Sequence, residues 1–520
     1  MDIRLFSLLM ALIMAAGCTH KMRPQNSSVT VRSYAHVQPL LKGMKHNAII
    51  RLGIYQPITA AGETVKVIEL KLNDAARASI DKFELYNTGI ETAFSTSKLV
   101  GTARSEGATI NVSLNLALKP GWNYLWLDAH VREDANMDAR PEVHISRVEF
   151  SKSKTTEIAE QGDYKRRIGV AVRKANDDGV HTYRIPGIAT TTKGSLIAVY
   201  DIRYKHSGDL PANIDVGMSR STDGGKTWEP MKVIMDMGAP HENNGIGDPA
   251  VLVDPATGKI WVAALWSKGN RSIAGSQPGL SPDTTGQFML ASSDDDGLTW
   301  SHPYNITTQV KDPKWHLYFN GPGNGIVMKD GTLVFPSQYW DESTKPGLPH
   351  SSIIYSRDNG KTWRSGIGAK ANTTESQVVE TTPGTLMLNM RDNRGRFRSV
   401  SITKDLGKTW VEHITSYNTL VDPVCMASFI KAEVNVPGKG NSEVLFFGNV
   451  ASPSTRHNMT VKASLDLGET WPHKYELLID ERMTYGYSAL TRIDANSLGY
   501  LYEGERDLYF VRIPVSELIK

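Results

Sequence analysis

Apolar side chains alternate with polar or small ones along much of the first third of the chain. The clearest run places an apolar residue at every second position from Ile110 to Leu118, and the segments 65–70 and 122–131 behave similarly. A period of two puts successive side chains on opposite faces of a half-buried strand. Strands at this spacing, without helical stretches between them, predict a β-sandwich over residues 34–155. The polar segment 151–167 marks a linker or domain boundary.

An octapeptide recurs five times in the rest of the chain. It reads Ser/Thr-x-Asp-x-Gly-x-Thr-Trp and occupies residues 221–228, 293–300, 356–363, 403–410 and 464–471. Its Ser and Asp side chains can bond nearby amides, its Gly allows a positive φ, and its Trp can fix the turn to a sheet. Repetition at this interval predicts sheets closed into a ring, a β-propeller over residues 163–520. Such turns specify architecture rather than activity, so we exclude their residues from the active site.

The N-terminus has the pattern of an export signal. Arg4 precedes a short apolar run, Leu5 to Met14, which is too short for the roughly 20 residues of a membrane-spanning helix. The sequence Ala-Ala-Gly-Cys follows and resembles a bacterial lipobox, in which Cys18 is lipidated and begins the mature chain. Ordinary cleavage near Ala16 is the alternative. We therefore expect a signal peptide over 1–17, a lipidated tether over 18–33, and a membrane-anchored bacterial lipoprotein in the periplasm or at the cell surface.

Composition narrows the possible partners. The 520 residues include 58 Lys and Arg against 55 Asp and Glu, a net charge of +3, which is too small for the basic surface of a nucleic-acid-binding protein. Two cysteines exclude a disulfide framework, and the 14 histidines show no metal-ligand spacing. We expect no metal and no cofactor. The second cysteine, Cys425, lies in an apolar run and is expected to pack in a core.

The hexapeptide His-Thr-Tyr-Arg-Ile-Pro, residues 181–186, stands ahead of the first octapeptide. Arg-Ile-Pro followed by five such Asp boxes resembles the sialidase (exo-α-neuraminidase) family over residues 165–520. The predicted sandwich resembles the carbohydrate-binding-like N-terminal domain of bacterial members. The resemblance implies that the propeller has six blades and that the protein is a retaining exo-α-sialidase, which removes terminal sialic acid from glycoproteins, glycolipids and oligosaccharides. A trans-sialidase, and a non-catalytic propeller lectin that binds sialic acid, are the alternatives.

Sialic acid carries a carboxylate on its anomeric carbon, and guanidinium groups bind carboxylates bidentately. The resemblance implies three arginines for this role. They are Arg184 in Arg-Ile-Pro, Arg391 in Leu-Asn-Met-Arg, and Arg456 shortly before the fifth octapeptide. Glu503 in Leu-Tyr-Glu-Gly matches the family's carboxylate that holds the first arginine, Arg184, in place.

The substrate carboxylate would repel a carboxylate nucleophile, whereas a neutral phenol avoids this repulsion if a base accepts its proton. Tyr-Gly-Tyr-Ser-Ala-Leu, residues 485–490, resembles the family's Tyr-Ser-x-Leu and implies Tyr487 as the nucleophile. Tyr485, two residues away, could share its face and is the rival. The implied base is Glu375, in Glu-Ser-Gln-Val, with Glu380 as its rival.

The general acid is expected on a loop of the first repeat. Family spacing implies Asp209, six residues after Arg203, and Arg203 itself is assigned to substrate binding. Asp201 and Asp215 lie in β-type runs and are interpreted as structural. Asp248, in Gly-Asp-Pro, resembles the acidic residue that contacts the ring or N-acyl substituents of the substrate.

Overall fold

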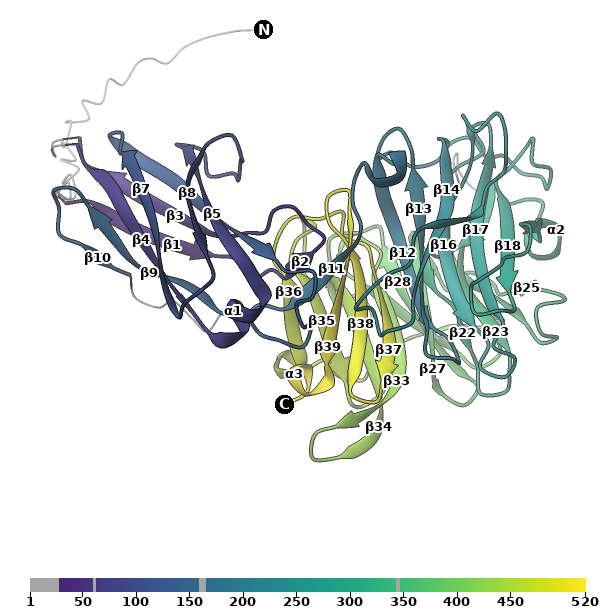
Figure 1. The fold of residues 1–520 in the computed structure, drawn as a ribbon. Coiled ribbons are helices and arrows are strands. Elements are labelled where there is room, and N and C mark those ends of the chain that lie inside the picture. Colours follow the sequence, from purple (N-terminus) through teal and green to yellow (C-terminus); the bar gives the residue numbers. More distant parts are fainter. Residues whose placement is uncertain (1–27, 59–61, 159–164, 343–346) are drawn as a thin grey trace, which may run out of the picture.

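The computed structural model describes residues 28–58, 62–158, 165–342 and 347–520. The fold is all-β, as the sequence predicts, and Figure 1 shows strands throughout the molecule. Helical segments are short: α1 (Asp74–Ser79), α2 (Thr307–Val310), α3 (Val515–Leu518), and the 3-10 turns η1 (Asp177–Gly179) and η2 (His473–Tyr475). Within the described ranges no helix has the length and apolar character needed to cross a bilayer.

Two sheets form the N-terminal part, at one end of the molecule in Figure 1. The first N-terminal sheet contains, in spatial order, β1 (Thr30–Ala35), β3 (Ala48–Gln56), β8 (Gly121–Val131), β5 (Ile80–Gly89) and β6 (Leu99–Arg104). The second contains β10 (Thr156–Glu157), β9 (Val143–Phe150), β4 (Thr64–Leu72) and β7 (Thr109–Ala117). Both sheets contribute to one hydrophobic cluster, with Leu52 and Phe83 from the first and Ile68 and Val112 from the second.

The alternating run at Ile110 to Leu118 corresponds to β7, in which Val112 and Leu116 are buried and the polar residues between them are not. Strand β1 begins at Thr30, inside the segment 18–33 that we expected to be a tether. The folded part therefore starts earlier than predicted, because β1 completes the edge of the first N-terminal sheet beside β3.

The remaining described strands form six sheets of four or more strands and one two-stranded pair. The first of the six sheets contains β12 (Thr182–Thr190), β13 (Leu196–Arg203), β14 (Ile214–Ser221) and β15 (Lys232–Met235). The second contains β16 (Asn244–Val253), β17 (Ile260–Lys268), β18 (Gln287–Ser293), β19 (Tyr304–Asn305) and β21 (Gly323–Asn324). The third contains β20 (Leu317–Asn320), β22 (Ile326–Val327), β23 (Leu333–Trp340), β24 (Pro349–Ser356), β25 (Arg364–Ser365) and β26 (Lys370–Ala371). The next two sheets contain β27 (Thr373–Thr382), β28 (Thr385–Asp392), β30 (Ser399–Thr403) and β31 (Val411–Glu412); and β33 (Ser428–Val436), β34 (Gly440–Val450), β35 (Met459–Ser464) and β36 (Glu476–Asp480). The sixth, which we call the closing sheet, contains β2 (Leu40–Lys42), β11 (Ile168–Arg173), β39 (Leu508–Pro514), β38 (Ser497–Glu503) and β37 (Ser488–Asp494), and the pair is β29 (Arg396–Phe397) with β32 (Val421–Asp422).

Each octapeptide joins the third and fourth strands of a sheet. In the second copy, Ser293 donates to Asp295 over 2.8 Å and accepts from the Gly297 amide over 3.0 Å. Thr299 donates to the same carboxylate through its amide at 2.8 Å and its hydroxyl at 2.6 Å. Bonds from Thr299 lower the pKa of Asp295 to about 2. Gly297 has a φ of +81°, and a Cβ there would lie 2.9 Å from Ile197, so a glycine is required.

The closing sheet joins distant parts of the chain. Strand β11 pairs antiparallel with β39, and β2 from the N-terminal part pairs parallel with β11. Figure 1 shows β2 and β11 beside β38 and β39. Leu41 in β2 is 2% exposed and packs in the same cluster as Val511. The predicted division into 34–155 and 163–520 is therefore wrong for β2, because this strand completes a sheet of the C-terminal part.

Candidate active site

Five of the candidate residues line one cavity of about 370 Å³, which we call the active-site cavity. They are Asp209, Asp248, Glu375, Arg391 and Tyr487. They come from four different sheets or their connecting loops, so the cavity exists only because the sheets are brought together. This volume is in the range of pockets that bind small molecules.

Tyr487 lies at the centre of a small polar network. Its hydroxyl donates a short hydrogen bond to Glu375 and accepts one from Arg391 at 2.9 Å. Arg391 also donates to the other oxygen of Glu375 at 2.5 Å. Burial and the neighbouring Glu375 raise the pKa of Tyr487 well above its ordinary value, although Arg391 opposes the shift. The phenol is therefore neutral at rest, with its proton directed at a carboxylate.

The structure separates Tyr487 from its rival. Gly486 has a φ of +94°, so the chain between the two tyrosines is not extended, and Tyr487 lines the cavity whereas Tyr485 does not. The ring of Tyr485 instead lies against the guanidinium of Arg184, 4.7 Å from its carbon. No hydrogen bond joins Tyr485 to Glu375 in the described residues.

The rival base lies elsewhere. Glu380 accepts hydrogen bonds from the amides of Lys329 at 2.7 Å and Gly384 at 2.8 Å, at the far end of β27. These bonds make Glu380 a turn-stabilising residue. Glu375, near the start of the same strand, is the residue that reaches the cavity.

Three guanidinium groups surround Tyr487. The carbons of Arg184 and Arg456 lie 5.2 and 5.7 Å from its ring centroid, and Arg391 bonds to its hydroxyl. Within the described chain, the buried Nε of Arg391 has no hydrogen-bond partner. A buried donor without a partner at a cavity favours an anionic ligand, because such a ligand would satisfy it.

Glu503 holds Arg184 and the backbone of Tyr487 in place. It is fully buried, and one oxygen accepts from Arg184 Nε at 3.1 Å and from the Ile185 amide at 2.9 Å. Its other oxygen accepts from the Tyr487 amide at 2.9 Å. One carboxylate therefore positions an arginine side chain and the backbone of the candidate nucleophile together.

Asp209 lies at the mouth of the cavity, with its side chain 77% exposed. One of its oxygens accepts from Arg203 at 2.7 Å and from Arg184 at 3.4 Å. Desolvation raises the pKa of Asp209, but the two guanidinium charges outweigh it, and the pKa lies below its ordinary value. In the ligand-free protein this carboxyl group is therefore ionised and paired.

Arg203 lies behind Asp209, beside the cavity. Its side chain is 1% exposed and does not line the cavity. Its donors are occupied by Asp201 at 2.8 and 3.1 Å, by the Ser207 carbonyl at 2.6 Å, and by Asp209. In this structure Arg203 holds Asp209 in place, and its assignment to substrate binding stays a prediction. Asp215 bonds to Tyr204 at 3.0 Å outside the cavity.

Asp248 lies in the cavity in a strained backbone conformation, with a φ of +58°. Its amide donates to Asp201 at 2.8 Å, and its carbonyl accepts from Asn320 at 2.6 Å. Burial raises the pKa of Asp248 well above its ordinary value, and the carboxylates of Asp201, Asp209 and Glu375 add to the shift. A protonated Asp248 can donate a hydrogen bond to a ligand.

An apolar wall faces the charged residues, and no sequence motif marks it. The wall consists of Ile185, Leu210, Leu265, Ile273, Ala274, Phe319 and Trp340. Trp340 stacks on Phe319 with ring centroids 5.7 Å apart. In the sequence, only the aromatic side chain of Trp340 and the aromatic residue beside it pointed to a place in this wall. The wall residues come from separate loops and strands, so no local pattern marks them.

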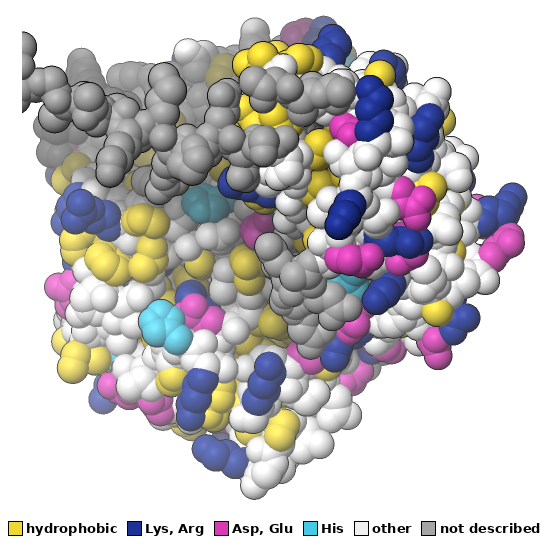
Figure 2. Space-filling model, turned by 90° about the vertical axis from the view of Figure 1, so that its left-hand side faces the viewer, with side chains coloured by type: hydrophobic (Ala, Val, Ile, Leu, Met, Phe, Trp, Pro, Cys, Tyr) yellow, Lys and Arg dark blue, Asp and Glu magenta, His cyan; other side chains and the backbone are white. Residues whose placement is uncertain are grey.

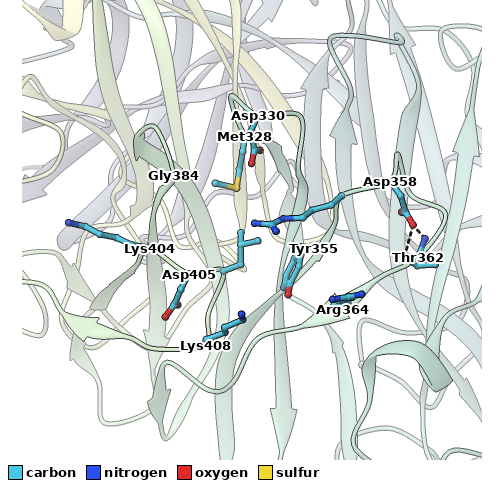
Figure 3. A pocket seen from close by; sticks show the side chains of 12 residues that line it. Met328, Asp330, Tyr355, Asp358, Thr362, Arg364, Gly384, Lys404, Asp405 and Lys408 are labelled. Carbon is cyan, nitrogen blue, oxygen red and sulfur yellow. Dashed lines mark hydrogen bonds between the residues drawn. The ribbon is translucent and has the colours of Figure 1, made fainter.

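A second cavity, of about 400 Å³, lies between the third and fourth octapeptide turns (Figure 3). Its acidic residues include Asp358 and Asp405, whose carboxylates are bonded to Thr362 and Thr409 within those turns. None of the candidate catalytic residues lines it, so we assign the chemistry to the first cavity.

Cys425 does not provide a nucleophile. Burial raises the pKa of Cys425 to about 12, and its side chain is fully buried. Cys18 lies outside the described residues. Among the described residues, the one group of His, Cys, Asp and Glu close enough to hold an ion lies in the first N-terminal sheet and not in this cavity.

Known proteins share sequence and fold with this chain. The BNR repeat-like domain family matches residues 185–478, and the N-terminal domain of BNR-repeat neuraminidase matches residues 26–154. A sialidase of Bacteroides fragilis is 46% identical over 414 residues, which cover 78% of this chain and 75% of the relative. A sialidase of Micromonospora viridifaciens is 34% identical over 63% of this chain and 50% of its own length. The solved Hadza microbial sialidase has 40% identity and a TM-score of 0.86, over 94% of this chain and all of that one.

Proposed function

The chain belongs to the sialidase family of glycoside hydrolases, and on this basis we propose that it is a retaining exo-α-sialidase that releases terminal sialic acid from glycoproteins, glycolipids and oligosaccharides. The observation that carries the proposal is the hydrogen bond from Tyr487 to Glu375 within a group of three arginines. A phenol bonded to a base supplies a nucleophile, and the guanidinium groups supply a site for the substrate carboxylate.

The carboxylate of sialic acid would bind between Arg184, Arg391 and Arg456. Arg391 Nε, which is buried without a partner, would gain an acceptor there. This placement brings the anomeric carbon, which bears the carboxylate, close to the Tyr487 hydroxyl. The apolar wall across the cavity would accept the less polar parts of the ligand.

In the first chemical step, the Tyr487 oxygen forms a bond to the anomeric carbon and its proton passes to Glu375. The bond from that carbon to the glycosidic oxygen breaks, and Asp209 donates a proton to the departing oxygen. Because the pKa of Tyr487 is raised, its proton leaves together with bond formation. Arg391 donates to the reacting phenolic oxygen and so stabilises the charge that develops on it.

Asp209 can act as an acid only if its pKa rises when substrate binds. The substrate carboxylate adds a negative charge and competes with Asp209 for Arg184, and both effects raise the pKa of this carboxyl group. In the second step Asp209 accepts a proton from water, which attacks the anomeric carbon. The bond to Tyr487 breaks and Glu375 returns the proton to the phenol. Two displacements on the same carbon give retention.

We further infer that the C-terminal part is a six-bladed propeller and the N-terminal part a sandwich. Six sheets follow one another along the chain, five of them carry an octapeptide turn, and the sixth closes the ring through β11 and β39. The two N-terminal sheets share one core, which is how a sandwich packs. A carbohydrate-binding role for this part remains our proposal.

Export and lipid attachment rest on the sequence of the N-terminus. We propose that Cys18 carries the lipid that anchors the enzyme to a membrane of the periplasm or cell surface. Cys18→Ala should release the protein into the soluble fraction with unchanged kcat on a soluble substrate. Unaltered membrane fractionation of this variant would show that Cys18 is not the attachment point.

The nucleophile is tested by comparing Tyr487→Phe with Tyr485→Phe, a matched control two residues away. The first change removes the oxygen that forms the bond, so activity should fall by orders of magnitude, and the second should have a much smaller effect. A fluorinated sialosyl fluoride should label the unaltered protein on Tyr487, as located by peptide mapping. An adduct on Tyr485 or on a carboxylate would refute the assignment.

The acid and the reaction outcome need separate measurements. Asp209→Ala should reduce activity on sialyllactose more than on an aryl sialoside, whose leaving group needs little protonation. NMR of the products over time would show whether α-sialic acid appears first, as retention requires. Transfer to added lactose, rather than to water, would indicate a trans-sialidase. Binding without turnover would indicate a lectin.

A further inference from the structure

Four potential metal ligands meet on one face of the first N-terminal sheet, outside the active-site cavity. Asp128 and His130 lie on β8, Glu84 lies on β5, and His46 lies two residues before β3. Asp128 pairs directly with Glu84 across the two strands, and His130 follows Asp128 by two residues on the same face. The sheet register therefore brings the group together, although no local spacing in the sequence reveals it.

The two carboxylates of this group need a positive charge between them. Glu84 is 8% exposed and Asp128 is fully buried. Like charges directly opposite on neighbouring strands are destabilising, and burial increases the cost. Lys82 neutralises one oxygen of Glu84 at 2.6 Å, but its side chain is 39% exposed. Asp128 has no such lysine or arginine partner among the described residues.

The ligand atoms point toward a common position. One candidate nitrogen or oxygen from each of the four side chains lies within 4.8 Å of all the others. His46 Nδ1 is 2.6 Å from Asp128, and His130 Nε2 is 2.9 Å from Glu84 and 3.7 Å from Asp128. Ligands of a tetrahedral zinc ion with bonds of about 2.0–2.1 Å lie roughly 3.3 Å apart, so these separations bracket the required value.

Outer hydrogen bonds hold the carboxylates in place. The second oxygen of Asp128 accepts from the Asn47 amide at 2.5 Å. Glu84 accepts from the Tyr86 hydroxyl at 2.6 Å and from Lys82. Bonds of this kind orient metal ligands and are part of a built site.

We propose that His46, Glu84, Asp128 and His130 form a binding site for a zinc-type divalent transition metal. Two imidazoles with two carboxylates suit zinc, whereas calcium and magnesium prefer sites built of oxygen alone. The His46 and His130 side chains are each 22% exposed, so an ion can reach the site. Figure 2 views the molecule from this end and shows histidine side chains on its surface among interspersed basic and acidic ones.

A bound ion would hold in place the turn between β2 of the closing sheet and β3 of the first N-terminal sheet. His46 and Asn47 follow β2, and the Asn47 side chain accepts from the Leu41 amide at 2.7 Å. A metal bonded to His46 would thereby tie β2 to the first N-terminal sheet through Asp128 and His130. The site is structural, and catalysis in the cavity does not depend on it.

The test uses the whole purified chain after treatment with a chelator. Titration with zinc chloride in a calorimeter should show one ion bound per chain, and zinc should raise Tm where magnesium and calcium do not. Cobalt(II) at the site should give the intense visible absorption of a tetrahedral complex. His46→Gln and His130→Gln should each weaken zinc binding more than tenfold. His144→Gln, on β9 of the second N-terminal sheet, is the matched control and should bind as the unaltered protein does.

Three results would overturn the proposal. The unaltered protein binding no zinc would show that the four side chains form a hydrogen-bonded network only, and this result does not depend on the folding of any variant. Equal zinc binding by the two histidine variants, with folding checked by circular dichroism, would place the ion elsewhere. Loss of zinc in Asp248→Asn, with the histidine variants unaffected, would place it in the active-site cavity.

Discussion

Replacing Glu503 by glutamine should damage stability and activity together. The amide has nearly the shape of the carboxylate but carries one acceptor and one donor. If the glutamine oxygen faces Arg184 and Ile185, its NH₂ group faces the Tyr487 amide, and two donors oppose each other. In the reverse orientation the NH₂ group faces the Arg184 Nε and the Ile185 amide, which are also donors. At least one buried donor therefore loses its acceptor in either orientation.

The size of the effect follows from these contacts. A hydrogen bond to a charged group contributes about 1.5–3 kcal/mol, and breaking a buried ion pair costs about 3–5 kcal/mol. Asp209 lies 3.4 Å from Arg184 and partly compensates the lost charge, so we expect the lower end, about 3 kcal/mol. Arg184 and Tyr487 would both lose their fixed positions, and a displacement of about 1 Å can reduce kcat/KM roughly 100-fold.

The assay is denaturant unfolding followed by tryptophan fluorescence, with kcat/KM measured on an aryl sialoside. A chain with several sheets can unfold in more than one step, so the relevant midpoint is that of the transition in which activity is lost. Glu505→Gln is the matched control, since Glu505 is exposed and two residues away. If Glu503→Gln has the same midpoint and kcat/KM as this control, Glu503 does not hold the site together.

Three further predictions concern other parts of the molecule. Arg391→Lys keeps the charge but loses the planar fork, so kcat/KM should fall about 100-fold, mainly through KM, while Arg396→Lys at an exposed position should leave it unchanged; equal values would remove Arg391 from the site. The pKa of Asp295 is lowered to about 2, so the contribution of its carboxylate to stability is present above about pH 4 and is lost as the pH falls toward 2. Over this pH range Tm should therefore decline less in Asp295→Asn than in the unaltered protein. Parallel plots of Tm against pH for the two proteins would contradict this role of Asp295. A chain truncated to begin at Gln161 keeps the catalytic residues but loses β2, so it should cleave aryl sialosides, with a lower Tm and a tendency to associate through the uncovered edge of β11 on gel filtration. A Tm equal to that of the full chain would show that β2 contributes nothing.

The sequence predicted many of the strands and turns and the polar residues of the active-site cavity. The period-two run at Ile110 and the octapeptide turns are local patterns, so they identified strands and repeats directly. Short motifs around Tyr487 and Glu375 resemble those of the sialidase family, and this resemblance implied two residues that the structure brings into contact. The apolar wall left no such signal, because residues such as Phe319 meet the others only after the sheets assemble.

Two features that the sequence did not reveal share a physical cause. Arg203 has the sequence context of a ligand-binding arginine, but its donors are already satisfied by Asp201 and Asp209 in the folded protein. The metal-ligand group was missed because Glu84 and Asp128 become neighbours only through the register of β5 and β8. The contacts of Arg203 and the grouping of Glu84 with Asp128 both depend on tertiary structure, which cannot be predicted from residue spacing along the chain.

The closing sheet has a consequence for the order of folding. Gly169 pairs with Val511, so almost the entire C-terminal part must be synthesised before β11 can meet β39. Pairings between such distant segments form slowly, because a long loop must close before the contacts form. Until then β11 exposes an unpaired edge, and the short parallel strand β2 can shield one side of it early. The pairing of β11 with β39 is therefore expected to form late, after the strands between them have been made.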